Sequence, residues 1–254
     1  MSRIQIETLG KSFDGRQVLQ NISLTLEPGR SLALIGPTAA GKTVLLKCLV
    51  GLYAPDEGTI HVDGADVTSP DMRAETLDDR IGMLFQQNAL FDSLSVWENI
   101  GFRLMARGST SAAARARAEE LLPQVGLPIE TADLFPADLS GGMQKRVGFA
   151  RAIATAPDIL LLDNPTAGLD PILAARIDAM ISSLARKNGA TVISATSNMV
   201  GLKQGYDDIA VLHDGALCWH GDADRAEKDD NPWLRQLLSG SRAGPIETIN
   251  IEVQ

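Results

Sequence analysis

The chain has 254 residues, 44% of them hydrophobic and 22% charged, and these are the proportions of a folded α/β domain with a sizeable core. Its 23 Lys and Arg against 32 Asp and Glu give a formal charge of −9, which argues against a general nucleic-acid binder because such a protein carries a basic face. No apolar run approaches the length of about 18 residues that spans a bilayer, and the first ten residues lack the apolar segment of a signal peptide, so we expect any membrane association to occur through a partner.

The N-terminal third predicts strands around a short helix. Alternating apolar positions over 3–9 and 19–26 indicate two half-buried strands, joined by a turn at 13–17. The continuous apolar run 31–35 predicts a buried strand, and the run 44–53 predicts a helix. The other strands expected before residue 88 are 59–62 and 81–86.

The middle of the chain, from about Asn88 to Ala156, predicts helices without strands. Segments 95–105, 111–122 and 141–154 all favour helix. We therefore predict a helical lobe of about 88–156, inserted between the strands of an α/β core.

The last third returns to strands and one long helix. The buried run 158–163 predicts a strand, and a helix is expected over 170–189. Asp170 would be the N-cap of that helix, Pro171 its first residue and Gly189 its end. The remaining expectations are strands at 190–196 and 208–221, a solvated acidic surface at 222–231 and a C-terminal tail at 241–254.

The segment Gly36 to Thr43, GPTAAGKT, fits the pattern G-x-x-x-x-G-K-[ST] between a predicted strand and a predicted helix. In this context we expect backbone N–H groups to surround phosphate at a helix N-terminus. Lys42 would neutralise the outer phosphates, and the Thr43 hydroxyl would bind Mg²⁺. A chance match on an ordinary turn is the alternative, and the strand-then-helix placement argues against it. The residues predicted to bind ATP here are Gly36, Pro37, Thr38, Ala39, Ala40, Gly41, Lys42, Thr43 and Val44.

A second glycine turn, Ser140-Gly141-Gly142, opens the helix predicted at 141–154. A serine-capped turn is the plain interpretation. The turn lies about twenty residues before the acid-ended strand 158–163, and its glycines leave backbone N–H groups open to phosphate.

Together these motifs resemble the ATP-binding subunits of ABC transporters, over residues 3–240. The resemblance implies one domain over 1–240, built as a P-loop NTPase core with an N-terminal antiparallel β subdomain and an inserted helical subdomain. Gly36 to Thr43 resembles the Walker A loop, Ile159 to Asp163 the Walker B strand, and Asp170 the end of the D-loop. Further positions that match family motifs are Ser140, Gly141, Gly142 and Met143 in the signature, Gln86 in the Q-loop, and Phe13 at the aromatic that stacks on adenine.

The same resemblance implies cofactors and partners. ATP would be held with Mg²⁺ by Thr43, Gln86 and Asp163, between the Walker A loop of one subunit and the signature of a second. A homodimer is expected, docked on an integral membrane permease through the surface of residues 86–94. Segments such as 42–64 and 139–154 are similar to the Mla/Mce-type phospholipid transporters, which implies lipid transport, further subunits of that type and a place on the inner face of the cell membrane. Cys48 and Cys218 have no metal-ligand spacing and indicate a reducing compartment, the cytoplasm.

Two positions depart from the family pattern where hydrolysis occurs. Asn164 follows the Walker B aspartate in place of Glu, and Ser197 stands where the switch His is usual. With Gln86, these are the predicted catalytic residues. Asn164 can accept a hydrogen bond from water but cannot take its proton, and general base help is worth about 10²–10⁴-fold, so slow hydrolysis is expected.

Three explanations of these departures stay open: a slow transport ATPase, a degenerate nucleotide-gated subunit with little turnover, and residues introduced to trap ATP. A chromosome-maintenance ATPase is excluded because no heptad-bearing segment interrupts the chain.

Overall fold

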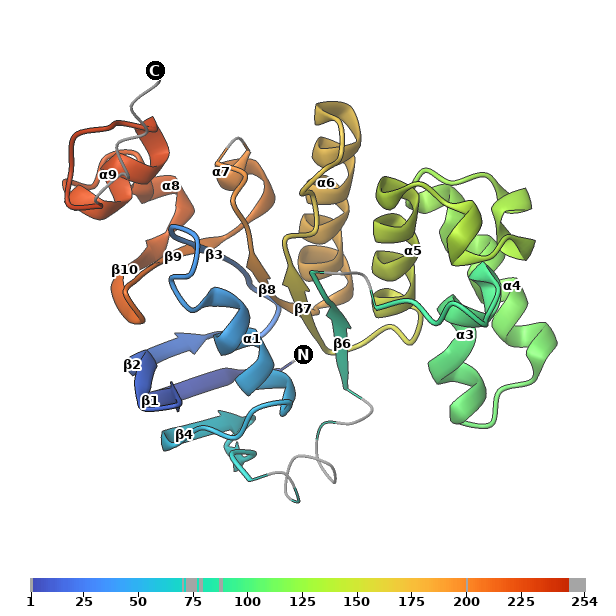
Figure 1. Ribbon diagram of the computed structural model, residues 1–254, viewed down its shortest axis with the longest axis horizontal. Helices are drawn as coiled ribbons and strands as arrows, with labels where there is room; N and C mark the ends of the chain where they lie inside the picture. The colour runs from blue at the N-terminus through green and yellow to red at the C-terminus, as the bar shows by residue number, and fades with distance from the viewer. Residues whose placement is uncertain are drawn as a thin grey trace.

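The structure is a computed structural model that describes residues 2–69, 71, 77, 80–86, 89–199 and 201–246. It has two β-sheets with a group of helices, α3 to α5, beside them (Figure 1). Among the described residues, no helix has the length and apolar character needed to cross a membrane.

The first sheet is antiparallel, with its strands in the order β2-β1-β4-β5. The first two strands run further than the alternating pattern predicts, because only Asp14 and Gly15 form the turn between them. Both turn residues have positive φ, at 49° and 78°, as the turns that suit twisted hairpins require. The strands are β1 (Ile4–Phe13), β2 (Arg16–Leu26), β4 (Glu57–Val62) and β5 (Ala65–Asp66).

The second sheet has the order β10-β9-β3-β8-β7-β6 and is parallel except for the edge hairpin of β9 and β10. Its parallel strands lie within the predicted strands 31–35, 81–86, 158–163, 190–196 and 208–221. They are β3 (Ser31–Ile35), β6 (Ile81–Leu84), β7 (Ile159–Asp163), β8 (Thr191–Ala195) and β9 (Asp208–His213), with β10 (Ala216–Asp222) at the edge.

Strand β3 is buried on both faces. Leu32 and Leu34 belong to a core shared with the first sheet and helix α1 (Lys42–Val50), whereas Ala33 and Ile35 belong to a second core with the helical lobe. Side chains alternate across a strand, so one apolar run supplies both cores. Because Ile35 is followed by Gly36, this doubly packed strand fixes the start of the phosphate loop.

Helix α1 ends earlier than predicted, and the extension to Tyr53 was wrong. Gly51 takes a left-handed conformation with φ 86°, and the N–H groups of Gly51 and Leu52 donate to the carbonyl groups of Cys48 and Lys47. This glycine cap stops the helix although the apolar pattern continues.

The residues between β6 and β7 form helices as predicted. They are α3 (Val96–Ala106), α4 (Ser111–Gln124) and α5 (Gly141–Ile153), with short 3₁₀ turns η1 (Ile129–Asp133) and η2 (Pro136–Asp138). The remaining helices are α6 (Pro171–Asn188), α7 (Leu202–Gly205), α8 (Ala223–Ala226) and α9 (Pro232–Ser239).

The acidic stretch 222–231 is only partly the solvated surface that its composition predicts. Ala223 and Ala226 of α8 are buried, and Asp229 accepts a hydrogen bond of 3.0 Å from the indole N–H of Trp219. The charges therefore surround a small packed helix.

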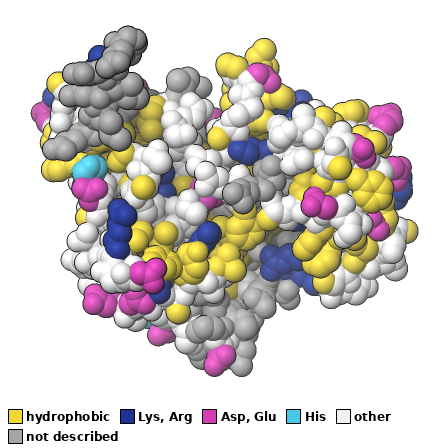
Figure 2. Space-filling model, in the orientation of Figure 1, with side chains coloured by type: hydrophobic (Ala, Val, Ile, Leu, Met, Phe, Trp, Pro, Cys, Tyr) yellow, Lys and Arg dark blue, Asp and Glu magenta, His cyan; other side chains and the backbone are white. Residues whose placement is uncertain are grey.

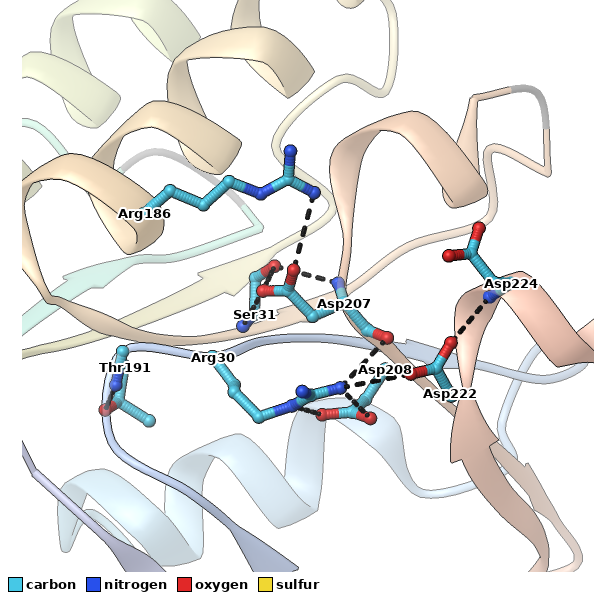
Figure 3. A network of polar contacts seen from close by, with 9 residues as sticks. Arg30, Ser31, Arg186, Thr191, Asp207, Asp208, Asp222 and Asp224 are labelled. Atoms are coloured by element: carbon cyan, nitrogen blue, oxygen red, sulfur yellow. Dashed lines mark hydrogen bonds and ion pairs between the residues drawn. The ribbon is translucent and has the colours of Figure 1, made fainter.

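A polar network ties the edge hairpin to the N-terminal end of β3 (Figure 3). The Arg30 guanidinium donates to both carboxylate oxygens of Asp208, at 2.6 and 2.8 Å. Asp207 accepts from the backbone N–H and the hydroxyl of Ser31, at 2.9 and 2.8 Å. Two-pronged charged hydrogen bonds are geometrically specific, so this network fixes the register of β9 against β3.

The first part of the predicted tail is held against α9. Buried Gln236 accepts from the N–H of Ile246 at 2.7 Å and donates to its carbonyl oxygen at 2.9 Å. Residues 247–254 lie outside the described residues.

Candidate functional site

The phosphate loop joins β3 to α1 through backbone conformations that few side chains accept. Gly36 has φ 151°, and a Cβ there would overlap the carbonyl oxygen of Leu212. Gly41 has φ 101°, and its Cβ would lie 2.8 Å from the Leu19 side chain. Ala39 has φ 63°, a left-handed conformation that costs a residue with a Cβ about 1 kcal/mol.

Lys42 folds back over this loop. Its ammonium donates to the carbonyl oxygens of Gly36 and Pro37, each at 2.7 Å. Burial lowers the pKa of Lys42, and attraction to Asp163 opposes that effect. The Lys42 ammonium thus lies at the N-terminus of α1, and both the cation and the helix N-terminus favour the binding of anions.

A hydroxyl and a carboxylate meet beside the loop. The Thr43 hydroxyl donates to Asp163 Oδ2 at 2.9 Å, and Asp163 is 1% exposed at the end of β7. Burial raises the pKa of this carboxyl, while the Thr43 hydrogen bond and the Lys42 charge oppose the rise. Within the described part of the chain, Asp163 Oδ1 is buried without a hydrogen-bond partner. A hydroxyl beside an unsatisfied carboxylate oxygen fits Mg²⁺, which prefers hard oxygen ligands.

Across the cleft, Asn164 and Ser197 are brought together. The Ser197 hydroxyl donates to Asn164 Oδ1 at 3.4 Å, although 33 positions separate the two residues. Asn164 has φ 51°, a conformation that Asn tolerates better than most residues. Its N–H donates to the Ala195 carbonyl of β8 at 2.8 Å, which fixes its backbone to the sheet.

One cleft of about 900 Å³ contains these parts. Gln86 and most of the phosphate loop line it together with Asn164 and Ser197, and their roles in ATP binding and hydrolysis stay predictions. Asp163 and Pro37 are not among the lining residues. The lining residues that the sequence did not indicate are Arg16, Gln17, Val18, Gln20, Lys145, Ala167, Asp214 and Gly215.

Phe13 is not among the residues that line this cleft. It ends β1 opposite Arg16, and its ring packs edge-on against Tyr53 with centroids 5.0 Å apart. The Lys11 ammonium lies 5.3 Å from the Phe13 ring centroid. Stacking on adenine stays a prediction for this residue.

The residues that resemble the family signature, Ser140 to Met143, are not among the lining residues of this cleft. Ser140 caps α5 and accepts from the Met143 N–H at 3.3 Å. Ser140 and Gly141 are exposed, and a Cβ on Gly141 would meet no atom within 4 Å. Met143 packs against the core. The start of α5 is therefore an open helix N-terminus.

Asp170 acts locally as the N-cap that the sequence predicts. Its carboxylate accepts from the N–H groups of Ile172 and Leu173, both at 3.0 Å. A contact of Asp170 with a second subunit stays a prediction.

A second hollow, of about 470 Å³, separates the core from the helical lobe. Phe91 and Phe102, 44% and 42% exposed, line it with ring centroids 4.7 Å apart. Arg103 and Arg151 add two cations to this apolar wall, and Figure 2 shows hydrophobic side chains gathered over the lobe at the right of the view.

Buried Asn99 organises the loop that presents Phe91. Its amide accepts from the Phe91 N–H at 2.8 Å and donates to the carbonyl oxygens of Phe91, Leu94 and Ser95 at 2.9–3.1 Å. Nothing in the sequence pattern marked this residue, because an Asn inside a helix usually faces solvent.

Comparison with known proteins agrees with this geometry. Residues 19–167 match the ABC transporter family. The chain is 35% identical over 246 residues to the probable ribonucleotide transport ATP-binding protein mkl of Mycobacterium tuberculosis, covering 96% of this chain and 68% of that protein. It is 34% identical over 263 residues to the chloroplastic protein TRIGALACTOSYLDIACYLGLYCEROL 3 of Arabidopsis thaliana, covering 96% and 75%. A solved dimeric ATP-binding cassette in a post-hydrolysis state with ADP and Pi superimposes with a TM-score of 0.82 at 30% identity, covering 87% of this chain and 98% of that chain.

Proposed function

The chain belongs to the ABC transporter family and is an ABC-type ATPase, and from this premise we propose that it energises phospholipid transport of the Mla/Mce type by slow ATP hydrolysis. The observation that carries the proposal is the single cleft that joins the phosphate loop to Asn164 and Ser197.

The binding half of the cleft suits Mg²⁺ and triphosphate. Lys42 is placed to exchange its carbonyl partners for phosphate oxygens, and Thr43 and Asp163 would hold Mg²⁺ with Gln86. Bound there, Mg²⁺ would neutralise charge on the phosphate oxygens.

The hydrolytic half suits slow chemistry. Asn164 Oδ1 accepts a hydrogen bond from Ser197 and is equally able to accept one from a water molecule. Neither side chain takes up a proton near neutral pH, so both orient water without acting as a base. Positioning and charge stabilisation carry most of phosphoryl transfer, and this leaves a reduced rate.

A head-to-tail dimer would complete each site. Ser140 and Gly141 sit exposed at the N-terminus of α5, outside their own cleft, where they are free to meet the phosphate bound by a second subunit. Ile172, beside Asp170, is 82% exposed and would be covered at such an interface. The similar solved cassette is itself dimeric.

The hollow at Phe91 would receive a segment of the membrane permease and place the protein on the inner face of the cell membrane. Its exposed aromatic rings suit an apolar helix face. Phe91→Ala should weaken binding to the permease while ATP affinity stays unchanged. Equal loss of both would show that Phe91 only stabilises the fold.

The Arabidopsis relative, whose name contains that of a lipid, supports lipid as the transported substrate. The mycobacterial relative, which is named for ribonucleotide transport, supports a different class of substrate. The second candidate function is a nucleotide-gated assembly subunit with little turnover, which Asn164 and Ser197 favour. Further Mla/Mce-type subunits belong to the first proposal only.

The test is Mg²⁺-dependent ATPase activity of the complex with its permease in phospholipid vesicles, measured beside Lys42→Ala. We expect a slow rate of ATP hydrolysis that exceeds the rate of the Lys42→Ala variant. This rate should rise under conditions in which labelled phospholipid moves between vesicles. A rate equal to that of Lys42→Ala, with ATP still bound, would favour the assembly subunit. Turnover stimulated by ribonucleotide but not by phospholipid would overturn the lipid assignment.

A further inference from the structure

Lys145 reaches the nucleotide cleft from the helical lobe. It lies one turn into α5, is 9% exposed and is part of the cleft lining. Burial lowers the pKa of its ammonium, and attraction to Asp163 opposes that effect. A buried lysine is costly unless its charge is used, so its contacts matter.

The Lys145 ammonium binds the loop that follows β7. It donates to the carbonyl oxygen of Ala167 at 2.7 Å and to that of Asn164 at 3.2 Å. The Asn164 carbonyl also accepts from the Ala167 N–H at 3.3 Å, which closes a turn at this point. Lys145 therefore clamps both ends of a four-residue turn.

The clamp fixes the direction of the Asn164 side chain. On one side, the Asn164 N–H is bonded to Ala195 of β8; on the other, its carbonyl is bonded to Lys145. With φ at 51°, the side chain is held toward Ser197 and the cleft. Loss of the Lys145 bond would leave the Asn164 carbonyl with only the turn bond from the Ala167 N–H.

Helix α5 connects this clamp to two other surfaces. Its first residues, Gly141 and Gly142, form the open N-terminus, and Arg151 and Ala152 near its other end line the hollow at Phe91. Arg151 lies six positions after Lys145, which is about 9 Å along a rigid helix. A change in the tilt of α5 would therefore move the Lys145 ammonium together with both surfaces.

We propose that Lys145 is a positioning residue for hydrolysis, through which the orientation of the helical lobe sets the angle of Asn164 toward the γ-phosphate. This role rests on the ATPase function proposed above. It predicts that Lys145 governs turnover and leaves nucleotide affinity nearly unchanged.

The experiment compares Lys145→Met with Lys145→Arg in the permease complex. We expect Lys145→Met to lower kcat about 10- to 100-fold, since displacing a reacting group by about 1 Å has an effect of that size, while KM for ATP changes less than about twofold. Lys145→Arg, which still reaches two carbonyl groups, should recover most of kcat. Arg117→Met is the matched control, because Arg117 also donates to a backbone carbonyl, that of Ala154 at 3.2 Å, but away from the cleft.

Hydrogen exchange of the isolated subunit gives a readout that does not need turnover. In Lys145→Met, the amides of Ala167 and Leu169 should exchange faster, while those of β8 keep their protection. If the ATPase activity of the wild type does not exceed that of Lys42→Ala, the proposed function fails. The exchange rates of these amides would still show whether Lys145 holds the turn 164–167.

Three results would overturn the proposal: unchanged exchange in 164–169, a rise in KM with kcat preserved, or equal effects of Arg117→Met. A rise in KM would mean that the ammonium acts on the nucleotide itself. If Lys145→Met does not fold, Lys145→Gln, which is uncharged and shorter, is judged by the same measurements.

Discussion

The two loops that face each other across the cleft are held in different ways. The phosphate loop is shaped by glycine conformations and by close contact with the strands beneath it. The loop after β7 is held by the backbone bond from Asn164 to Ala195 and, in addition, by two side-chain groups, the Lys145 ammonium and the Ser197 hydroxyl. The loop proposed to bind nucleotide thus depends mainly on its backbone, whereas the loop proposed to serve hydrolysis also depends on side chains that a substitution can replace. This difference explains how a chain can keep the first while altering the second.

Gly36→Ala should have the largest effect. The added Cβ would overlap the Leu212 carbonyl oxygen at a φ of 151°, so the phosphate loop cannot close as it does in the wild type. We expect ATP affinity to fall by more than about 100-fold, measured by titration with a fluorescent ATP analogue. Gly64→Ala, at a positive-φ turn with no atom within 4 Å of its Cβ, is the control and should bind ATP normally. Normal binding by Gly36→Ala would show that the loop is not shaped by its backbone.

Asn164→Asp should raise turnover and leave ATP affinity nearly unchanged. Asp matches Asn in size and also tolerates φ 51°, so it adds a base without backbone strain. We expect kcat to rise by about 100-fold with ATP affinity within about threefold. Asn164→Glu restores the family's longer carboxylate at a cost of about 1 kcal/mol in stability for its left-handed backbone. Unchanged rates in both variants would show that the missing carboxylate does not limit hydrolysis.

Asp178→Asn tests how a carboxyl near Ser197 changes the free energy of unfolding with pH. Asp178 of α6 lines a hollow behind the loop with Thr166 and Ser197, and burial raises its pKa to about 6. The folded state then binds a proton more readily than the unfolded state, so this group lowers stability as pH rises from about 4 to about 6. After allowance for partial exposure, Asp178→Asn should add about 1 kcal/mol to the free energy of unfolding at pH 7.5 and almost nothing at pH 4. Urea unfolding at the two pH values measures the change, and Asp230→Asn, at a side chain that is 92% exposed, is the surface control.

Ala39→Gly should have the smallest effect. It removes the strain of a positive φ but increases the conformational entropy of the unfolded chain. The free energy of unfolding should therefore rise by only about 0.5 kcal/mol. Ala40→Gly should instead destabilise the protein, because Ala40 is 3% exposed and packs in the core without a positive φ. Thermal unfolding of the two variants compares neighbouring positions in one loop, and equal shifts would contradict this assignment.

The sequence predicted most of the fold because the relevant signals are local. Short buried runs marked the parallel strands, and Asp170, Pro171 and Gly189 marked the ends of α6. Prediction failed where a local glycine overrode an apolar pattern, as at Gly51, and where packing buried two alanines among acidic residues in α8.

The candidate site was predictable only where its residues form a contiguous motif. The phosphate loop and Asp163 stand in such motifs, and Asn164 was noted because it departs from one. Lys145 and Asn99 donate to carbonyl groups that the folded chain brings to them, so their residue types carried no signal.

Strand β3 has a consequence for how the molecule unfolds. Its alternate side chains belong to two cores, and neither core can dissolve while the other keeps the strand in place. The antiparallel sheet and the helical lobe are thereby joined into one cooperative unit despite their separate positions in Figure 1. Calorimetry should record one transition for both, and weakening either core should loosen the phosphate loop that leaves β3 at Gly36.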